Sequence, residues 1–85
     1  MARTDDSAAT RIANSAALGE LVRRVRREAG LDQATAAGLA GVGVRFLGDI
    51  ERGKPTVRLD LVLQVLDRLG LDVMVTRRTH NRRAP

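Results

Sequence analysis

The sequence has no cysteine, tryptophan or tyrosine, and it contains one histidine and one phenylalanine. Without cysteine, the chain can build neither disulfides nor a thiolate zinc site. The histidine, His80, lies in a polar stretch between Thr79 and Asn81, and the parts for Ser/His or Cys/His nucleophilic chemistry are missing. One aromatic side chain is also too few for the stacked platform on which proteins bind single-stranded nucleic acids. We therefore expect no catalytic residues, no metal, no cofactor and no enzymatic activity.

Long apolar runs are absent as well, so the sequence predicts no membrane span and no membrane partner. The first residues include Asp5 and Asp6 and no apolar signal core, and we expect a cytoplasmic protein. With 85 residues, 44% of them hydrophobic, the chain is long enough for one small domain whose core lies near the lower limit for unaided folding. Dimerisation would enlarge that core.

The net charge of +5 is concentrated at the C-terminus. Residues 1–17 have two basic and two acidic side chains, residues 18–76 have nine and eight, and residues 77–85 have four arginines and no acidic residue. Because the central part is nearly neutral, affinity for nucleic acid must come from local patches and the tail. We predict a mobile arm over residues 1–14, a folded domain over 15–76 and a basic disordered tail over 77–85.

Hydrophobic spacing and glycine stops predict four short helices. The first begins after Ser15 as its N-cap, has apolar residues at i, i+3, i+4 and i+7, and ends at Gly30. The second is capped by Asp32 and ends at Gly41, which can adopt the left-handed conformation at low cost. The expected helical ranges are 16–29, 33–40, 44–51 and 59–69.

The second and third of these helices are joined by a tight turn over residues 41–43. This is the arrangement of a helix-turn-helix motif, which presents its second helix to the DNA major groove. If Leu47 and Ile50 anchor that helix in the core, the helical wheel directs Arg45, Gly48 and Asp49 outward. The motif therefore predicts a protein that binds double-stranded DNA.

Arg45 is the expected base-reading residue, because its guanidinium matches the O6 and N7 acceptors of guanine. Asp49 can accept a hydrogen bond from a cytosine amino group, and glycine at position 48 would let the helix backbone approach the groove closely. The alternative is that Arg45 and Asp49 pair with each other at i, i+4 on a solvated helix.

We expect further DNA contacts from residues before and after Arg45 in the motif. Val44 and Phe46 flank the outward face, and Phe46 is either a core plug or an apolar contact to a thymine methyl group. Gln33 begins the preceding helix, where backbone N–H groups favour a phosphate. Arg52 and Lys54 follow the reading helix and are placed for the sugar-phosphate backbone. The arginines of the first helix are either a solvated face or further DNA contacts.

After Gly70 the hydrophobic pattern changes period. Leu71, Val73 and Val75 alternate with more polar positions, which is typical of a half-buried strand. A lone strand leaves its backbone groups unpaired, so we expect pairing with the same strand of a second copy across a two-fold axis, with Met74 also in the interface. The alternative is a helical or irregular cap over the core.

The spacing of these residues resembles the Cro/C1-type (XRE) family of helix-turn-helix repressors. The matching positions are Val22, Arg26, Gly30, Gln33, Ala37, Gly41, Val42, Leu47, Ile50, Glu51, Gly53 and Lys54. The resemblance implies an all-α, lambda-repressor-like domain of four to five short helices with a C-terminal strand that pairs across a dimer. It also implies an internal ion pair between Arg26 and Glu51. The DNA contacts that carry over are Gln33, Val44, Arg45, Phe46, Asp49, Arg52 and Lys54.

The stretch from Glu51 to Val75 is more narrowly similar to the HipB-type antitoxins. That resemblance implies an autorepressor of a toxin-antitoxin operon, with a HipA-like serine/threonine kinase toxin as partner. The chain departs from the family pattern at Ala36, where a bulkier residue is usual, and at Gly38 and Gly43, where a better helix former and a Ser or Thr cap are common.

We thus expect a sequence-specific repressor that acts as a symmetric homodimer on a palindromic operator, with half-sites about one helical turn apart or a simple multiple of it. Two other hypotheses stay open. One is a free-standing transcriptional regulator without a toxin, and the other is a protein-binding adaptor with weak DNA binding.

Overall fold

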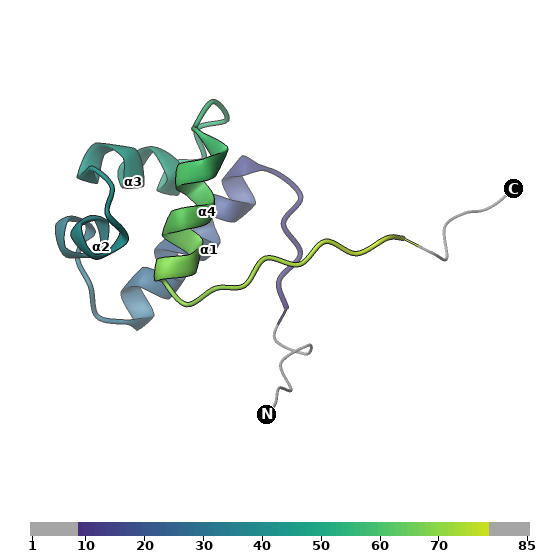
Figure 1. Cartoon of the computed structure of the whole chain (residues 1–85), viewed down its shortest axis with the longest axis horizontal. Coiled ribbons are helices and arrows are strands. Elements are labelled where there is room, and N and C mark those ends of the chain that lie inside the picture. Colours follow the sequence, from purple (N-terminus) through teal and green to yellow (C-terminus); the bar gives the residue numbers. More distant parts are fainter. Residues whose placement is uncertain (1–8, 79–85) are drawn as a thin grey trace, which may run out of the picture.

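The computed structural model describes residues 9–78 and contains four α-helices in that range. They are α1 (Ser15–Glu28), α2 (Gln33–Ala40), α3 (Val44–Glu51) and α4 (Leu59–Arg68). Figure 1 shows α2 and α3 next to each other at one end of the molecule, and α4 crossing in front of α1 beside them. The expected all-α fold is confirmed, and the boundaries of α2 and α3 agree with those predicted from the sequence.

The ends of α1 and α2 have local causes. Asp32 caps α2, because its carboxylate accepts a hydrogen bond from the Thr35 backbone N–H at 2.7 Å. Gly41 ends α2 with φ 75°, the left-handed conformation that favours glycine. The prediction for α1 was wrong by one residue at each end, since the helix ends at Glu28 and Ala29 is its C-cap. Asn14 is the N-cap, with its side-chain oxygen 2.9 Å from the Ala17 nitrogen, and Ser15 is the first helical residue.

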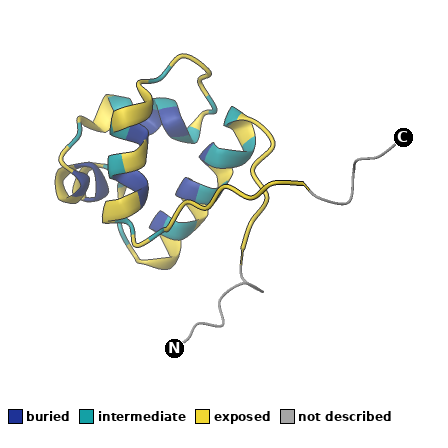
Figure 2. Cartoon of the chain, turned by 45° about the vertical axis from the view of Figure 1, so that its right-hand side comes forward, coloured by how far each residue is buried: buried dark blue, intermediate teal, exposed yellow. Residues whose placement is uncertain are grey.

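The core is formed where the four helices face one another. Val22, Leu47 and Val65, from three different helices, are its largest fully buried side chains. Figure 2 shows that the buried residues lie on the inner sides of the helices. Three alanines of α2, at positions 36, 37 and 40, are also buried. Small side chains therefore let α2 pack closely against α3 and α4.

Gly19 allows α1 to lie directly against the C-terminal end of α3. A Cβ atom at this position would be 2.3 Å from the carbonyl oxygen of Ile50 and 2.8 Å from that of Glu51. Since no side chain fits at such distances, the packing of α1 on α3 requires glycine here. This contact was not predicted, although a glycine inside an amphipathic helical pattern is a signal for close backbone approach.

Helix α4 holds the C-terminal end of α2. Gln64 donates from Nε2 to the Ala40 carbonyl oxygen at 2.7 Å, and Arg68 donates from Nη1 to the Leu39 carbonyl oxygen at 3.2 Å. Both bonds satisfy carbonyl groups that a helix leaves without partners at its C-terminus. The hydrophobic pattern of α4 indicates only its apolar face and does not predict these two bonds.

The segment after α4 is extended, but no strand is formed within residues 9–78. Leu71 is half-buried and packs against the core, whereas Val73, Met74 and Val75 are 55%, 79% and 94% exposed. The half-buried alternation expected for residues 71–76 is thus absent from this single chain. Residues 1–8 of the expected arm and 79–85 of the expected tail lie outside the described residues.

None of the helices in the described range is long and apolar enough to cross a membrane.

Candidate DNA-binding surface

Helix α3 is buried on one side and open on the other. Leu47 and Ile50 are 1% and 3% exposed, so both anchors expected from the sequence lie in the core. Val44 is 49% exposed on the outer side. Arg45 is also exposed, and its side chain has no hydrogen bond or ion pair with the rest of residues 9–78. The two buried anchors hold α3 in place, and the guanidinium of Arg45 on its outer side is free to bind a ligand.

A buried ion pair fixes the C-terminal end of α3 to α1. Arg26 donates from Nε to Glu51 Oε2 at 2.6 Å and from Nη2 to Glu51 Oε1 at 2.9 Å, the two-point geometry that planar guanidinium and carboxylate groups favour. The Arg26 and Glu51 side chains are 9% and 3% exposed. Arg26 also donates from Nη1 to the Leu31 carbonyl oxygen at 2.8 Å. One guanidinium thus connects α1, α3 and the loop that leads to α2.

Gln33 belongs to the same network. Its Nε2 donates to Glu51 Oε1 at 3.0 Å, which links the first residue of α2 to the last residue of α3. The sequence predicted a phosphate contact for this amide and did not predict the bond to Glu51. One N–H of the amide is used inside the protein, and a second N–H remains available as a donor.

The network sets the charge state of its two ionised members. Burial by itself would raise the pKa of Glu51, but hydrogen bonds from Arg26 and Gln33, with the nearby charges of Arg26 and Arg23, bring that pKa below its ordinary value. The hydrogen bond with Glu51 is the largest influence on Arg26 and raises its pKa despite burial. Both groups therefore stay charged at neutral pH, as an ion pair requires.

On the outer side of α3, Asp49 has two cationic neighbours. Arg52 donates from Nη2 to Asp49 Oδ1 at 2.5 Å, and Lys54 Nζ lies 3.7 Å from Asp49 Oδ2. The alternative interpretation of the sequence, an ion pair between Arg45 and Asp49, is wrong, because the carboxylate pairs with Arg52 and Lys54 instead. Arg45 is left unpaired as a result.

The surface over Gly48 also differs from the expectation. A Cβ atom at position 48 would be 3.1 Å from Nη1 of Arg52, so the guanidinium of Arg52 lies across the glycine. Gly48 is consequently buried, although it is on the outer side of the helix. The sequence predicted an open backbone at this position, and the structure shows a covered one.

Phe46 is partly buried and packs against the core, which agrees with the core-plug interpretation of this residue. Of the residues expected at the DNA, Arg45 and Val44 are exposed on the outer face of α3, while Asp49, Arg52 and Lys54 form one cluster. Gln33 is linked to Glu51 at the adjacent end of α2. All of these residues come from α2, α3 and the three residues after α3.

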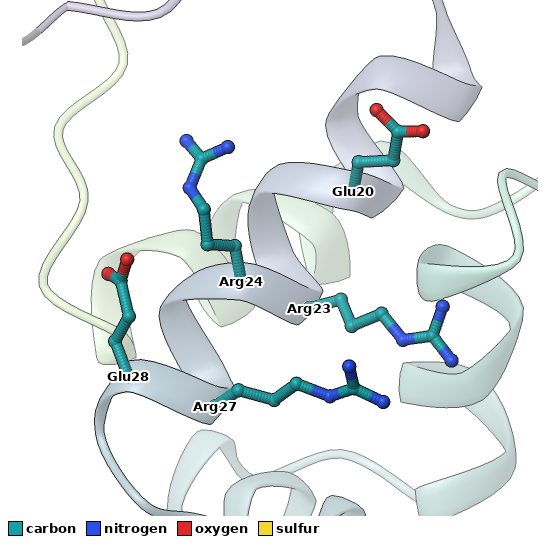
Figure 3. Close-up of a pocket in the computed structure, with 5 residues that line it drawn as sticks. All are labelled: Glu20, Arg23, Arg24, Arg27 and Glu28. Atoms are coloured by element: carbon teal, nitrogen blue, oxygen red, sulfur yellow. The ribbon is translucent and has the colours of Figure 1, made fainter.

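A further basic surface lies on α1. Figure 3 shows Arg23 and Arg27 extending in the same direction from this helix, whereas Arg24 and Glu28 extend elsewhere. Arg23 is near enough to Glu51 for its charge to lower the pKa of that carboxyl. Arg23 and Arg27 therefore lie on the side of α1 that faces the network at the ends of α2 and α3.

The four helices, with α2 and α3 joined by a tight turn and the outer side of α3 exposed, are the arrangement of helix-turn-helix proteins. A family model described as a helix-turn-helix domain matches residues 17–78. The chain is also 52% identical over 65 residues to an uncharacterized HTH-type transcriptional regulator, y4mF, of Sinorhizobium fredii (strain NBRC 101917 / NGR234); this match covers 76% of the present chain and 86% of that protein.

Solved structures give the same fold. HipB in a complex with an O4 20mer covers 84% of this chain and 100% of its own with a TM-score of 0.74 at 18% identity, and a HipA-HipB-O2-O3 complex gives the same values. The restriction-modification controller protein C.AhdI from Aeromonas hydrophila is 31% identical, with a TM-score of 0.61, and the match covers 68% of this chain and 84% of that one.

The chain belongs to the Cro/C1-type family of helix-turn-helix proteins and is a DNA-binding transcriptional regulator.

Proposed function

We propose that this protein is a repressor that binds a palindromic operator as a homodimer and acts as the antitoxin of a toxin-antitoxin operon. The observation that carries the DNA-binding part is the outer face of α3, where an unpaired and exposed Arg45 stands opposite two buried anchors, Leu47 and Ile50. A guanidinium without a partner in the protein has all five of its N–H donors available for a ligand, and the buried anchors fix the position of the helix that carries it. Repression follows when the bound protein occludes the promoter.

The contacts divide into two kinds. Arg45 reads a guanine from the major groove, with Val44 and the edge of Phe46 beside it on α3. The backbone N–H groups at the start of α2, with the second N–H of Gln33, hold a phosphate, and so does Lys54. The Asp49 and Arg52 pair completes this surface. Residues 15–76 form the unit that contains both the DNA contacts and the dimer interface.

Dimerisation is supported by an apolar groove that lies between α1, α4, residues 9–12 before α1 and residues 71–78 after α4. Its lining includes Leu21 and Val25 of α1, Leu63 of α4 and residues 71–75. Val73, Met74 and Val75 are largely exposed in the single chain, and together with Leu71 they form the proposed dimer segment. Pairing of this segment with that of a second copy would satisfy its backbone groups and cover its apolar side chains.

The antitoxin role is supported by similarity to HipB, whose solved structures include a complex with an O4 20mer and a HipA-HipB-O2-O3 complex. The partner we propose for this chain is a HipA-like serine/threonine kinase encoded next to it. The test uses the purified product of the neighbouring reading frame. Co-elution of the two proteins with a shift in molar mass would support the antitoxin role, and separate elution at micromolar concentration would refute it.

DNA binding is tested with the region upstream of the protein's own gene. Footprinting should show protection of two half-sites whose centres lie about 34–36 Å apart along the helix, or a simple multiple of this spacing. Arg45→Ala should relax specificity at one base pair in each half-site, at a cost of about 1–3 kcal/mol there. A uniform loss of affinity for all operator variants would refute the role of Arg45.

The dimer is tested with Val73→Asp/Val75→Asp, two changes that place charges in the proposed interface. Light scattering should then give the molar mass of one chain, because buried carboxylates without partners strongly oppose association. The matched control is Leu39→Asp, which alters a residue of α2 that is 60% exposed and away from the groove. A monomeric wild-type protein would overturn the homodimer and the palindromic operator together.

A second candidate function is a free-standing transcriptional regulator. The observation in its favour is the similarity to C.AhdI, a controller protein, which is 31% identical to this chain, whereas HipB in the O4 complex is 18% identical. A protected operator without any toxin-like neighbouring gene would favour this candidate.

A further inference from the structure

The side chain of Arg52 turns back along α3. Arg52 is the C-cap residue of α3. Its φ of −85° and ψ of −1° lie in the right-handed helical region, so its side chain leaves the backbone much as it would from one more residue of the helix. Its guanidinium lies against Gly48, one turn earlier, where a Cβ atom would meet Nη1 at 3.1 Å. The cationic group is thus displaced from the end of the helix toward its middle.

This displacement brings Arg52 onto the same face as Arg45. At about 100° per residue, positions 45 and 52 differ by only about 20° around the helix, and position 48 is between them along its axis. A guanidinium at the level of Gly48 is about 4.5 Å along the axis from Arg45. Successive base pairs are spaced by about 3.4 Å, so two arginines this close on one face of a helix in the major groove can reach neighbouring base pairs.

Asp49 holds Arg52 in this position. Oδ1 of Asp49 accepts from Arg52 Nη2, and Oδ2 lies 3.7 Å from Lys54 Nζ. The side chain of Asp49 is 22% exposed, while that of Arg52 is 68% exposed. The carboxylate therefore has both oxygens turned to cations of the protein, and the guanidinium that it orients is open to a ligand.

We propose that Arg52 is a second base-reading side chain, that Gly48 provides the space for it, and that Asp49 is its positioning residue. This inference rests on the proposed function and changes the roles within it: Arg52 reads a guanine next to the base pair read by Arg45, and Asp49 does not itself bind a cytosine. The guanidinium has five N–H donors, so it can keep one bond to Asp49 and still donate two to guanine O6 and N7.

The test uses two substitutions, Arg52→Lys and Gly48→Ala; the second adds a Cβ atom 3.1 Å from Nη1 of Arg52, so that the guanidinium has to move by a few tenths of an ångström. The matched control is Gly38→Ala in α2, where a Cβ atom meets nothing within 4 Å. Both changes put alanine into a helix and raise its intrinsic stability similarly. Each protein is titrated against the operator and against variants of every base pair in a half-site.

Arg52→Lys should lose discrimination at one base pair adjacent to that of Arg45, by roughly 5- to 150-fold, and Gly48→Ala should lose less at the same base pair, because the exposed guanidinium of Arg52 is displaced by only a few tenths of an ångström. Lysine keeps the charge but lacks the planar fork, so it preserves a phosphate contact and not a guanine contact. Asp49→Asn should weaken discrimination at the same base pair. Gly38→Ala should leave the whole specificity profile unchanged.

The inference is overturned if Arg52→Lys keeps the wild-type specificity profile, or if Gly48→Ala loses affinity for all sequences alike. Either result would make Arg52 a phosphate contact. A wild-type protein that binds every sequence equally would instead overturn the proposed function, and the two failures are thereby distinguished.

Discussion

Glu51→Ala is the substitution that most directly tests how the reading helix is held. In the wild-type protein Glu51 accepts three side-chain hydrogen bonds, two from Arg26 and one from Gln33. Without the carboxylate, Arg26 keeps only its bond to the Leu31 carbonyl, and its side chain is 9% exposed. Leaving one charge of a buried pair without its partner costs about 3–5 kcal/mol.

That cost is large compared with the stability of so small a domain. At 0.05–0.15 kcal/mol per residue, a chain of 85 residues has a free energy of unfolding of roughly 4–13 kcal/mol. We therefore expect Glu51→Ala to remove a large share of it. Urea denaturation followed by far-ultraviolet circular dichroism measures the loss, at one fixed protein concentration because association would contribute to stability.

A double-mutant cycle separates the ion pair from the packing around it. Arg26→Met and Glu51→Leu each leave one buried charge, whereas the double variant leaves none. We expect the double variant to lose less stability than the two single losses together, with a coupling energy of at least about 1 kcal/mol. Single losses below about 1 kcal/mol, or losses that simply add, would refute the inference that this pair anchors α3.

Three further predictions concern the same region. Gly19→Ala should lower the free energy of unfolding by about 1–3 kcal/mol, because its Cβ would meet the Ile50 carbonyl at 2.3 Å and force α1 away from α3. Arg23→Ala/Arg27→Ala should reduce the slope of log affinity against log salt by about 0.9 for each phosphate that the variant no longer neutralises. Stability should also fall as the pH drops below about 4.3, the ordinary pKa of glutamate, because the pKa of folded Glu51 is lower and the unfolded chain takes up the proton first.

Each of these predictions has a control and a result that would contradict it. Gly38→Ala should be neutral or stabilising; equal effects of Gly19→Ala and Gly38→Ala would contradict the close packing of α1 on α3. Arg24→Ala changes an arginine that extends in another direction, and an equal change of salt slope would make the effect one of net charge. Glu51→Gln should have a shallower loss of stability in acid than the wild-type protein, and identical pH profiles would contradict the assignment.

The helices were predictable because their signals are local. Apolar residues at helical spacing, Asp32 as a cap and Gly41 as a stop determine where α2 begins and ends, and the structure agrees. The start of α1 could not be predicted to the residue, because Asn14 and Ser15 are both favourable N-cap residues and the geometry of the first turn selects Asn14. Within α3, the wheel correctly buried Leu47 and Ile50.

The surface chemistry was less predictable, because it depends on side chains that meet through the fold. The bonds from Gln64 to the end of α2 and from Gln33 to Glu51 join residues 24 and 18 positions apart. No pattern along the chain indicates them. The pairing of Asp49 with Arg52 in place of Arg45 is local. Both pairs have helical spacing, and the order with the acidic residue nearer the N-terminus, which Asp49 and Arg52 have, is the more favourable one.

The buried side of α3 stabilises the fold, and its exposed side is available for binding. Leu47, Ile50 and Glu51 keep the domain folded, whereas Val44 and Arg45 touch little of it. Substitutions on the open side therefore leave folding almost unaffected while they alter which sequence is bound. Such a scaffold can be retargeted to a new site by exchanging a few outward residues, and duplicated copies in one genome can become insulated from each other by the same route.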